Sequence, residues 1–183
     1  MERRAELPLG VVVERRAIDH PWQKWRWLPV AVIPGAPAAD GRWRELLSGP
    51  GWTRYHAATL PLVLHRRETD AYRANLSGAR PAVYVVLRPD DDPASPAPVR
   101  PALVTASPWE AQGYLESGFE VVEGVPMPEG LVAWVQAFID RHHVDEPFRK
   151  RRRQPATPED AAFGRRSPPA AGPDPRRGGR RFG

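Results

Sequence analysis

Residues 141–155, RHHVDEPFRKRRRQP, combine two histidines, two acidic residues and five consecutive cations. Such a stretch could hold a metal ion or bind the phosphates of a nucleic acid. His142 and His143 are adjacent, so on a helix their side chains point about 100° apart and do not chelate one ion together. His142 and Glu146 have the i, i+4 spacing, but Pro147 indicates a helix end, and no third ligand is specified. We therefore predict no metal site, and we expect both imidazoles to stabilise the negative end of a helix dipole.

A second ionisable group lies in RRETDAYR, residues 66–73. Four of its side chains could form an acid–base site if they were buried together: Glu68, Asp70, Tyr72 and Arg73. Clusters of this type are usually solvated helix faces with i, i+3 and i, i+4 pairs. We therefore predict a surface cluster and assign no catalytic residue. The sequence has no phosphate-binding glycine loop, G-x-S-x-G elbow or H-E-x-x-H motif, so we expect a protein that is not an enzyme and that needs no cofactor.

Three tryptophans, Trp22, Trp25 and Trp27, lie within six residues, with Arg26 between the last two. Exposed aromatic rings beside cations are typical of surfaces that stack on nucleic-acid bases. Trp25 and Trp27 share one face of a strand, however, and such a pair in a small sheet protein usually packs in the core or across strands. We therefore predict packing for this pair, with base stacking as the alternative.

The charge of the chain is divided unevenly between a body and a tail. Residues 149–183 contain 11 Lys and Arg against three acidic residues, whereas residues 1–148 contain 16 basic and 19 acidic residues. The tail is rich in Arg, Pro, Gly and Ala and has almost no large apolar side chains, so burial cannot offset the entropy of ordering it. We predict one domain over residues 1–148 and a disordered basic tail over 149–183, which binds RNA or DNA, binds an acidic protein, or keeps the protein soluble.

Cysteine is absent from the sequence, which excludes disulfides, thiol nucleophiles and cysteine-ligated zinc or iron–sulfur clusters in this chain. The apolar run near the N-terminus is too short for a secretory signal. The longest uncharged stretch, residues 28–39, is interrupted by prolines and is shorter than the roughly 20 residues needed to span a bilayer. We expect a cytoplasmic protein without a membrane span.

Alternating apolar residues in the first hundred positions predict β-strands. Val11 and Val13 share one strand face, and so do Leu60, Leu62 and Leu64. The segments that predict strands are LGVVVERR, WRWLPVAVIPG, TLPLVLHR, PAVYVVLR and FEVVEGVPMP.

The clearest helix signal is TASPWEAQGYLESG, residues 105–118. Ser107 and Glu110 have the spacing of a capping box, Pro108 occupies the first helical position, and Gly118 ends the helix. ETDAYRANLSG predicts a shorter helix, with Thr69 as its cap and Gly78 as its stop.

A third helix is predicted over PEGLVAWVQAFIDRHH, which carries an apolar stripe at positions i, i+3, i+4, i+7, i+8 and i+11. The stripe is Leu131, Trp134, Val135, Phe138, Ile139 and His142. We expect His142 to pack against the sheet and His143 to be more exposed. The elements together predict an α+β fold in which a mainly antiparallel sheet is covered by two or three helices.

Motifs along residues 8–153 resemble a family of bacterial proteins of unknown function. The motifs, in order, are PLGVVVERR, WQKWRWLPVAV, LHRRETDAYRANL, VYVVLR, TASPWEAQGYLESG, VPMPEG and WVQAFIDRHHVDEPFRKRRR. Genes of this family often lie beside those of molybdenum-dependent formate dehydrogenases and their accessory proteins, and members sometimes carry names taken from molybdopterin guanine dinucleotide synthesis. The resemblance implies the same setting for this protein.

A nucleotidyl transfer activity does not fit the residues, because the guanylyltransferase of that pathway has a glycine-rich loop followed by a lysine, and LPLGVVVERR has Gly10 alone. The resemblance therefore implies a non-enzymatic accessory role in making or inserting the molybdenum cofactor or in assembling the dehydrogenase. The protein partner would then be the molybdoenzyme or its maturation proteins, and the alternative is a nucleic-acid-binding protein that uses the basic tail. The residues that we expect to form one partner-binding element are His142, His143, Phe148, Arg149, Lys150, Arg151, Arg152 and Arg153.

Overall fold

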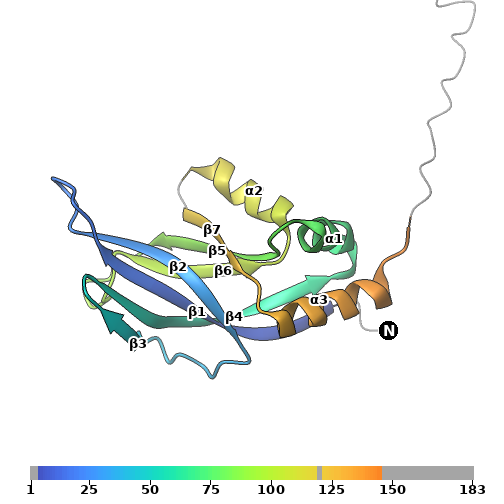
Figure 1. The fold of residues 1–183 in the computed structure, drawn as a ribbon, viewed down its shortest axis with the longest axis horizontal. Coiled ribbons are helices and arrows are strands. Elements are labelled where there is room, and N and C mark those ends of the chain that lie inside the picture. Colours follow the sequence, from blue (N-terminus) through green and yellow to red (C-terminus); the bar gives the residue numbers. More distant parts are fainter. Residues whose placement is uncertain (1–3, 119–120, 146–183) are drawn as a thin grey trace, which may run out of the picture. The chain divides into compact units, whose positions relative to one another are not determined.

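The computed structural model describes residues 4–118 and 121–145, and it has an α+β fold (Figure 1). Within these residues, seven strands and three α-helices follow one another, with one turn of 3-10 helix before the first α-helix. In chain order the elements are β1 (Arg4–Ala17), β2 (Trp25–Pro34), β3 (Arg44–Gly49), β4 (Trp52–His65), η1 (Arg66–Glu68), α1 (Thr69–Ser77), β5 (Ala82–Pro89), β6 (Val99–Thr105), α2 (Pro108–Ser117), β7 (Val121–Pro126) and α3 (Glu129–His142). None of the helices in the described part of the chain is long and apolar enough to cross a membrane.

The strands form two antiparallel sheets, where the sequence led us to expect one. A four-stranded sheet has the order β2-β1-β4-β3, and a three-stranded sheet has the order β6-β5-β7. Leu9, Val11 and Leu62 from the larger sheet share one buried cluster with Val83 and Val85 from the smaller sheet. The alternating apolar residues therefore face the core between the two sheets, as their period of two predicted.

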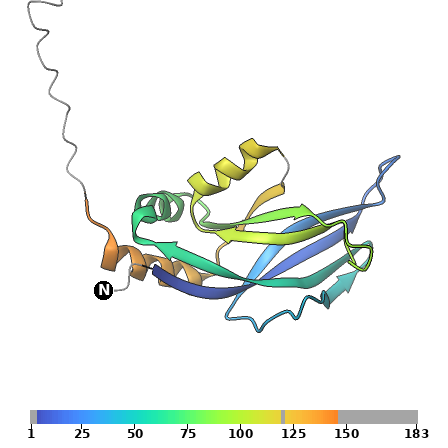
Figure 2. The same cartoon turned by 180° about the vertical axis from the view of Figure 1, so that it is seen from behind.

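The helices cover one end and one outer face of this pair of sheets (Figures 1 and 2). α2 lies over the smaller sheet, and α1 and α3 pack against each other at the end opposite the β1–β2 hairpin. The apolar stripe of α3 is buried at Leu131, Val135, Phe138 and Ile139, which join the core. This confirms the amphipathic face predicted for the last helix.

The capping signal of α2 is confirmed at both ends. Ser107 Oγ accepts a hydrogen bond from the Glu110 N–H at 3.2 Å, Pro108 is the first helical residue, and Gly118 has a left-handed φ of 71°. The second half of the capping box is missing, because the Glu110 carboxylate accepts a 2.6 Å hydrogen bond from Thr105 Oγ1 instead of reaching back to Ser107.

The start of α1 differs from the prediction. Thr69 is the first helical residue and not a cap, since η1 has already wound the chain, and its hydroxyl donates back to the Arg66 carbonyl at 3.2 Å. Gly78 ends the helix as predicted, but with an extended backbone, so the glycine is not required there for a left-handed turn.

The tryptophan segment is packed at two of its three positions. Trp27 contacts Trp43 and Tyr55 at ring distances of 5.6 and 6.2 Å, and the guanidinium of Arg15 lies 4.4 Å from the centre of the Trp25 ring. The packing predicted for this pair is therefore confirmed. Trp22, in the β1–β2 hairpin, is 90% exposed.

The outer face of β1 requires a glycine at one point. A Cβ atom on Gly10 would lie 2.7 Å from Ala36 Cβ and 3.0 Å from His56 Nε2. His56 cannot easily move, because it is 3% exposed and its Nε2 lies 2.9 Å from the hydroxyl of Thr59, which donates to the Pro37 carbonyl at 2.6 Å.

We expect Gly10→Ala to lower the free energy of unfolding by about 1–3 kcal/mol, since the added methyl overpacks this contact. Urea unfolding measures the change. Gly113→Ala is the matched control, because a Cβ there meets nothing within 4 Å and the position lies inside α2, where alanine is about 0.5–1 kcal/mol better than glycine. Equal stability of Gly10→Ala and the wild type would contradict the packing described for β1.

Candidate functional site

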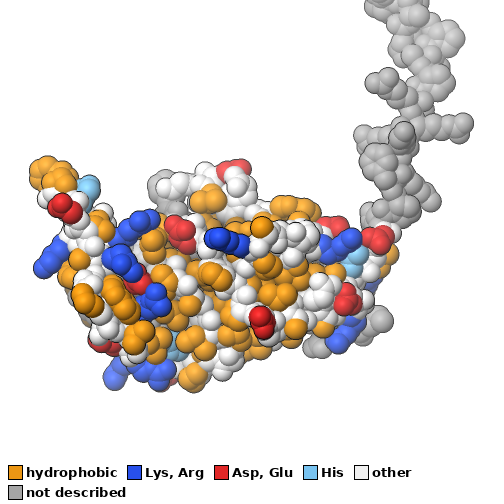
Figure 3. Space-filling view, viewed as in Figure 1, with side chains coloured by type: hydrophobic (Ala, Val, Ile, Leu, Met, Phe, Trp, Pro, Cys, Tyr) orange, Lys and Arg blue, Asp and Glu red, His pale blue; other side chains and the backbone are white. Residues whose placement is uncertain are grey.

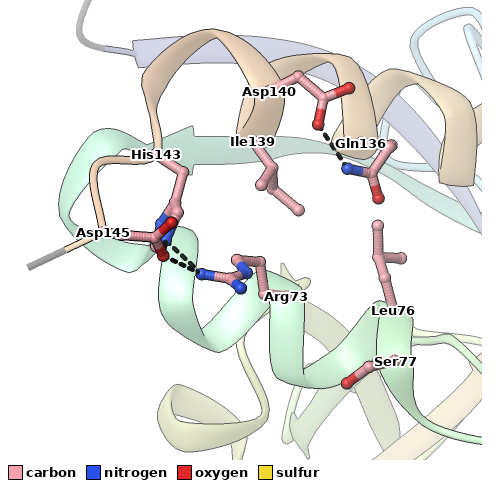
Figure 4. Close-up of a pocket in the computed structure, with 8 residues that line it drawn as sticks. All are labelled: Arg73, Leu76, Ser77, Gln136, Ile139, Asp140, His143 and Asp145. Carbon is pink, nitrogen blue, oxygen red and sulfur yellow. Dashed lines mark hydrogen bonds and ion pairs between the residues drawn. The ribbon is translucent and has the colours of Figure 1, made fainter.

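Two groups of residues that lie far apart in the sequence meet between α1 and the end of α3. Thr69, Asp70 and Arg73 come from the first turns of α1, and His143 is the C-cap residue directly after α3. His143 Nδ1 lies 3.0 Å from Thr69 Oγ1 and 3.9 Å from Asp70 Oδ1, and Arg73 Nη1 contacts His143 Nε2. Asp145 completes the group, with its Oδ1 2.9 Å from Arg73 Nη1 (Figure 4).

The hydrogen bonds determine how His143 carries its proton. The single hydroxyl proton of Thr69 is donated to the Arg66 carbonyl, so the short contact to His143 Nδ1 requires that nitrogen to be the donor. Neutral His143 then has an unprotonated Nε2, which accepts from the Arg73 guanidinium. Arg73 donates to both His143 and Asp145 and thereby joins the two helices.

Asp145 is the carboxylate of this group. Its Oδ1 lies 3.0 Å from His143 Nε2 and 2.9 Å from Arg73 Nη1. The contacts with His143 and then Arg73 hold the pKa of the Asp145 carboxyl below its usual range.

A hollow of about 470 Å³ opens beside this group (Figure 4). Leu76 from α1 and Ile139 from α3 supply apolar lining, and on α3 the Gln136 side chain donates to Asp140 at 2.7 Å. Arg73 lines the same hollow. The hollow therefore presents two apolar side chains beside charged and polar ones.

The four residues considered for an acid–base site, and predicted as a surface cluster, do not form one group. The Glu68 carboxylate accepts a 3.0 Å hydrogen bond from Ser107 Oγ at the start of α2, whereas the Asp70 side chain is 68% exposed. Tyr72 is only 2% exposed, so its inclusion in a surface cluster was wrong, and its hydroxyl accepts from the His65 N–H at 3.0 Å. Only Asp70 and Arg73 of the four residues reach the group around His143.

The buried hydroxyl of Tyr72 should make stability depend on alkaline pH. Burial, together with the nearby Glu68 and Glu110 carboxylates, raises the pKa of Tyr72 to about 12, whereas the hydrogen bond from the His65 N–H acts in the opposite direction. In the unfolded chain this hydroxyl titrates near 10, so between pH 10 and 12 the unfolded state releases a proton that the folded state keeps. The contribution of Tyr72 to the free energy of unfolding is complete below pH 10. It is lost as pH rises to 12, and the loss is up to about 3 kcal/mol.

Tyr72→Phe tests this dependence, because the other three tyrosines remain in both proteins. The variant should itself lose about 1–3 kcal/mol, since the His65 N–H loses its acceptor. In urea unfolding across this pH window, the wild type should lose stability more steeply than the variant. Parallel curves would show that Tyr72 does not titrate as its burial requires.

The two histidines behave differently from our expectation. The His142 ring lies 4.6 Å from the Phe138 ring on the same helix. His143, expected to be the more exposed of the two, has a side chain that is only 12% exposed, because α1 covers it. The described residues contain no group of three or more potential ligands placed to hold a metal ion. Phe148 and Arg149–Arg153 lie outside the described residues.

Melting curves with added zinc and with a chelator test whether either histidine binds a metal. We expect both to leave the melting temperature unchanged, since a bound ion would raise it by mass action. His142→Ala should cost about 1–3 kcal/mol through lost packing on Phe138. His143→Ala should cost about 1–2 kcal/mol through its hydrogen bonds, and not the small amount that an exposed side chain would lose. A zinc-dependent rise that His143→Ala abolishes would contradict the structural role.

Two members of the group around His143 were not predicted as site residues. Asp145 lies two residues after His143, and Thr69, which opens α1, was predicted only as a helix cap. The available signal for Asp145 was its position in HHVDEP, just past the helix end. Nothing in the local sequence indicates that α1 lies beside that helix end.

Comparisons with known proteins support one assignment. Neither a curated protein nor a solved structure matches the chain. A family model matches residues 8–152, most of the chain, and its description is protein of unknown function (DUF3305). The match begins in β1 and runs past the group around His143, so the chain belongs to the DUF3305 family.

Proposed function

We propose that this protein is a non-enzymatic accessory protein that binds a protein partner and supports molybdopterin cofactor synthesis or insertion, or the assembly of a molybdenum-dependent formate dehydrogenase. The molybdenum link comes from the resemblance of the sequence motifs. One observation carries the non-enzymatic part: Glu68 and Tyr72, which could do acid–base chemistry, are engaged in contacts that hold the fold.

The partner-binding element that we propose starts at the group around His143. Arg73, His143 and Asp145 fix the end of α3 against α1, beside the hollow lined by Leu76 and Ile139. In the sequence, Phe148 and the five cations Arg149–Arg153 follow Asp145 within eight residues. A partner that binds at this end of the helix pair is therefore within reach of these cations.

The chemistry of the element indicates the kind of partner. Five consecutive cations attract a surface rich in carboxylates, and Arg side chains bind carboxylates in two-point contacts. The apolar lining of the hollow and Phe148 add sites for apolar side chains. The partner surface should therefore be acidic with an apolar centre, and binding should weaken as salt rises.

Deletion of the gene in the native host tests this function. Formate dehydrogenase activity should fall while the dehydrogenase polypeptides remain present, because maturation and not synthesis is impaired. The wild-type gene should restore activity. A gene in which Arg149–Arg153 are replaced by Gln should restore less, and replacement of Arg165 and Arg166 by Gln is the matched control within the same tail. Unchanged activity after deletion contradicts the proposal.

A further inference from the structure

The end of the molecule opposite α1 and α3 carries a group of cations and one exposed aromatic ring, Trp22. Figure 3 shows Lys and Arg side chains gathered at the end that bears the β1–β2 hairpin. Trp22 in this hairpin is 90% exposed. An exposed ring of this size contributes nothing to the core, so the fold does not require it.

Cations and aromatic rings form a row across three strands of the larger sheet. Arg16 of β1 lies directly opposite Arg26 of β2 on one side and Trp52 of β4 on the other. Like charges directly opposite each other on a sheet are destabilising. Arg54, two residues along β4 from Trp52, places its guanidinium 5.2 Å from the centre of the Trp52 ring.

The charge of this surface is only partly neutralised within the protein. Glu14 accepts hydrogen bonds from Arg16 at 2.7 Å and Arg54 at 2.9 Å. Burial raises the pKa of the Glu14 carboxyl, but these two hydrogen bonds and the charges of both arginines lower it below the usual range, so the group is ionised at neutral pH. One carboxylate thus faces two arginines, and Arg26 adds a further cation with no carboxylate bound to it among the described residues.

The hairpin loop adds an exposed cation beside the row. Lys24 Nζ lies 5.4 Å from the centre of the Trp25 ring. Asp19 is the acidic residue in the loop of this hairpin. Cations outnumber carboxylates here, and each cluster of cations includes an aromatic ring.

We propose that this surface, defined by Trp22, Lys24, Arg26, Arg16, Arg54 and Trp52, binds single-stranded nucleic acid. The cations would contact phosphates and the exposed Trp22 ring would stack on a base, the combination by which proteins bind single strands without reading their sequence. Membrane insertion fits less well, because the loop that carries Trp22 also holds Asp19, His20 and Gln23 and has too little apolar area.

Fluorescence anisotropy with the full chain tests the proposal, using labelled oligouridine and oligothymidine of about 15 nucleotides at about 50 mM salt. Trp22→Ala should weaken binding about tenfold, and Trp22→Phe should retain most of it, since phenylalanine also stacks. Arg26→Gln should reduce the slope of log affinity against log salt by about 0.7. Comparison of the RNA and DNA probes shows whether the surface prefers single-stranded RNA or single-stranded DNA.

Two control variants keep the test specific. Trp109→Ala removes another exposed tryptophan, 59% exposed on α2, and should leave binding unchanged. Arg80→Gln removes a cation outside the surface and should also leave binding unchanged. Trp22→Ala should keep the wild-type melting temperature, because the ring is exposed.

Three results would overturn the proposal. The first is binding that Trp22→Ala and Arg26→Gln leave intact, because the oligonucleotide would then be held elsewhere on the chain. The second is no binding at low salt. The third is Trp22-dependent binding to vesicles of anionic lipid without any binding to oligonucleotides, which would assign the hairpin to membranes.

Discussion

Replacement of Asn75 by Ala is expected to lower the free energy of unfolding by about 3–5 kcal/mol. Asn75 is 6% exposed and connects α1 to the smaller sheet. Its Nδ2 donates to the Ala82 carbonyl at 2.7 Å and the Ala106 carbonyl at 2.8 Å, and its Oδ1 accepts from the Ala82 N–H at 3.0 Å. Removing the amide leaves three main-chain groups without their partner, and each costs about 1–3 kcal/mol when buried.

Urea unfolding of three variants separates the parts of this effect. Asn75→Asp keeps the acceptor for the Ala82 N–H but loses both donors, so it should be destabilised as well. Ser77→Ala is the control on the same helix, since the Ser77 hydroxyl is exposed and donates to the Ala74 carbonyl within the helix. A loss below about 1 kcal/mol for Asn75→Ala would show that water replaces the amide and that the connection is not needed.

Replacement of Phe138 by Ala is expected to cost about 3–5 kcal/mol. The ring is 5% exposed and contacts Tyr72 of α1, with ring centres 6.4 Å apart, and His142 one turn later on α3. The variant therefore removes the packing that holds α3 against α1, on which the position of His143 depends. Cavity creation and the lost aromatic contacts act in the same direction.

Thermal or urea unfolding measures the loss, with Gln136→Ala as the control on the exposed face of α3. That variant removes the hydrogen bond to Asp140 at an exposed position and should change stability by less than about 0.5 kcal/mol. Similar losses for both variants would mean that the buried face of α3 does not anchor the helix.

Local sequence signals predicted the elements whose stability is decided locally. The start of α2 follows from Ser107, Pro108 and Glu110, and the buried face of α3 follows from its apolar stripe. The fold class was predicted for the same reason, because alternation and capping indicate strands and helices before any tertiary contact is known.

Features that depend on distant contacts were not predicted. β6 (Val99–Thr105) was not predicted from the sequence, and its Pro101 pairs with Leu87 of β5 where the register shifts. Division into two sheets, likewise, is decided by packing between β4 and β6 and not by any one segment.

The group around His143 shows the same limit at the site. Arg73 and His143 were both singled out, but in separate clusters. They are 70 residues apart in the sequence, and no local pattern indicated that they are in contact. Glu68 was predicted to lie in a surface cluster with Asp70, whereas its carboxylate accepts a hydrogen bond from Ser107, the N-cap residue of α2. Side-chain partners of this kind are set by how α1, α2 and α3 pack.

Affinity purification of the full chain from its native host, followed by quantitative mass spectrometry, tests the proposed partner-binding role most directly. Wild-type protein and the variant with Arg149–Arg153 replaced by Gln are compared at low and high salt, with the Arg165 and Arg166 replacement as the control. We expect formate dehydrogenase subunits or cofactor-synthesis proteins with the wild type and the control, and their loss with the Arg149–Arg153 variant and at high salt. Recovery of ribosomal proteins alone would contradict the role. Equal recovery of the same partner proteins with the wild type, the Arg149–Arg153 variant and the control would also contradict it.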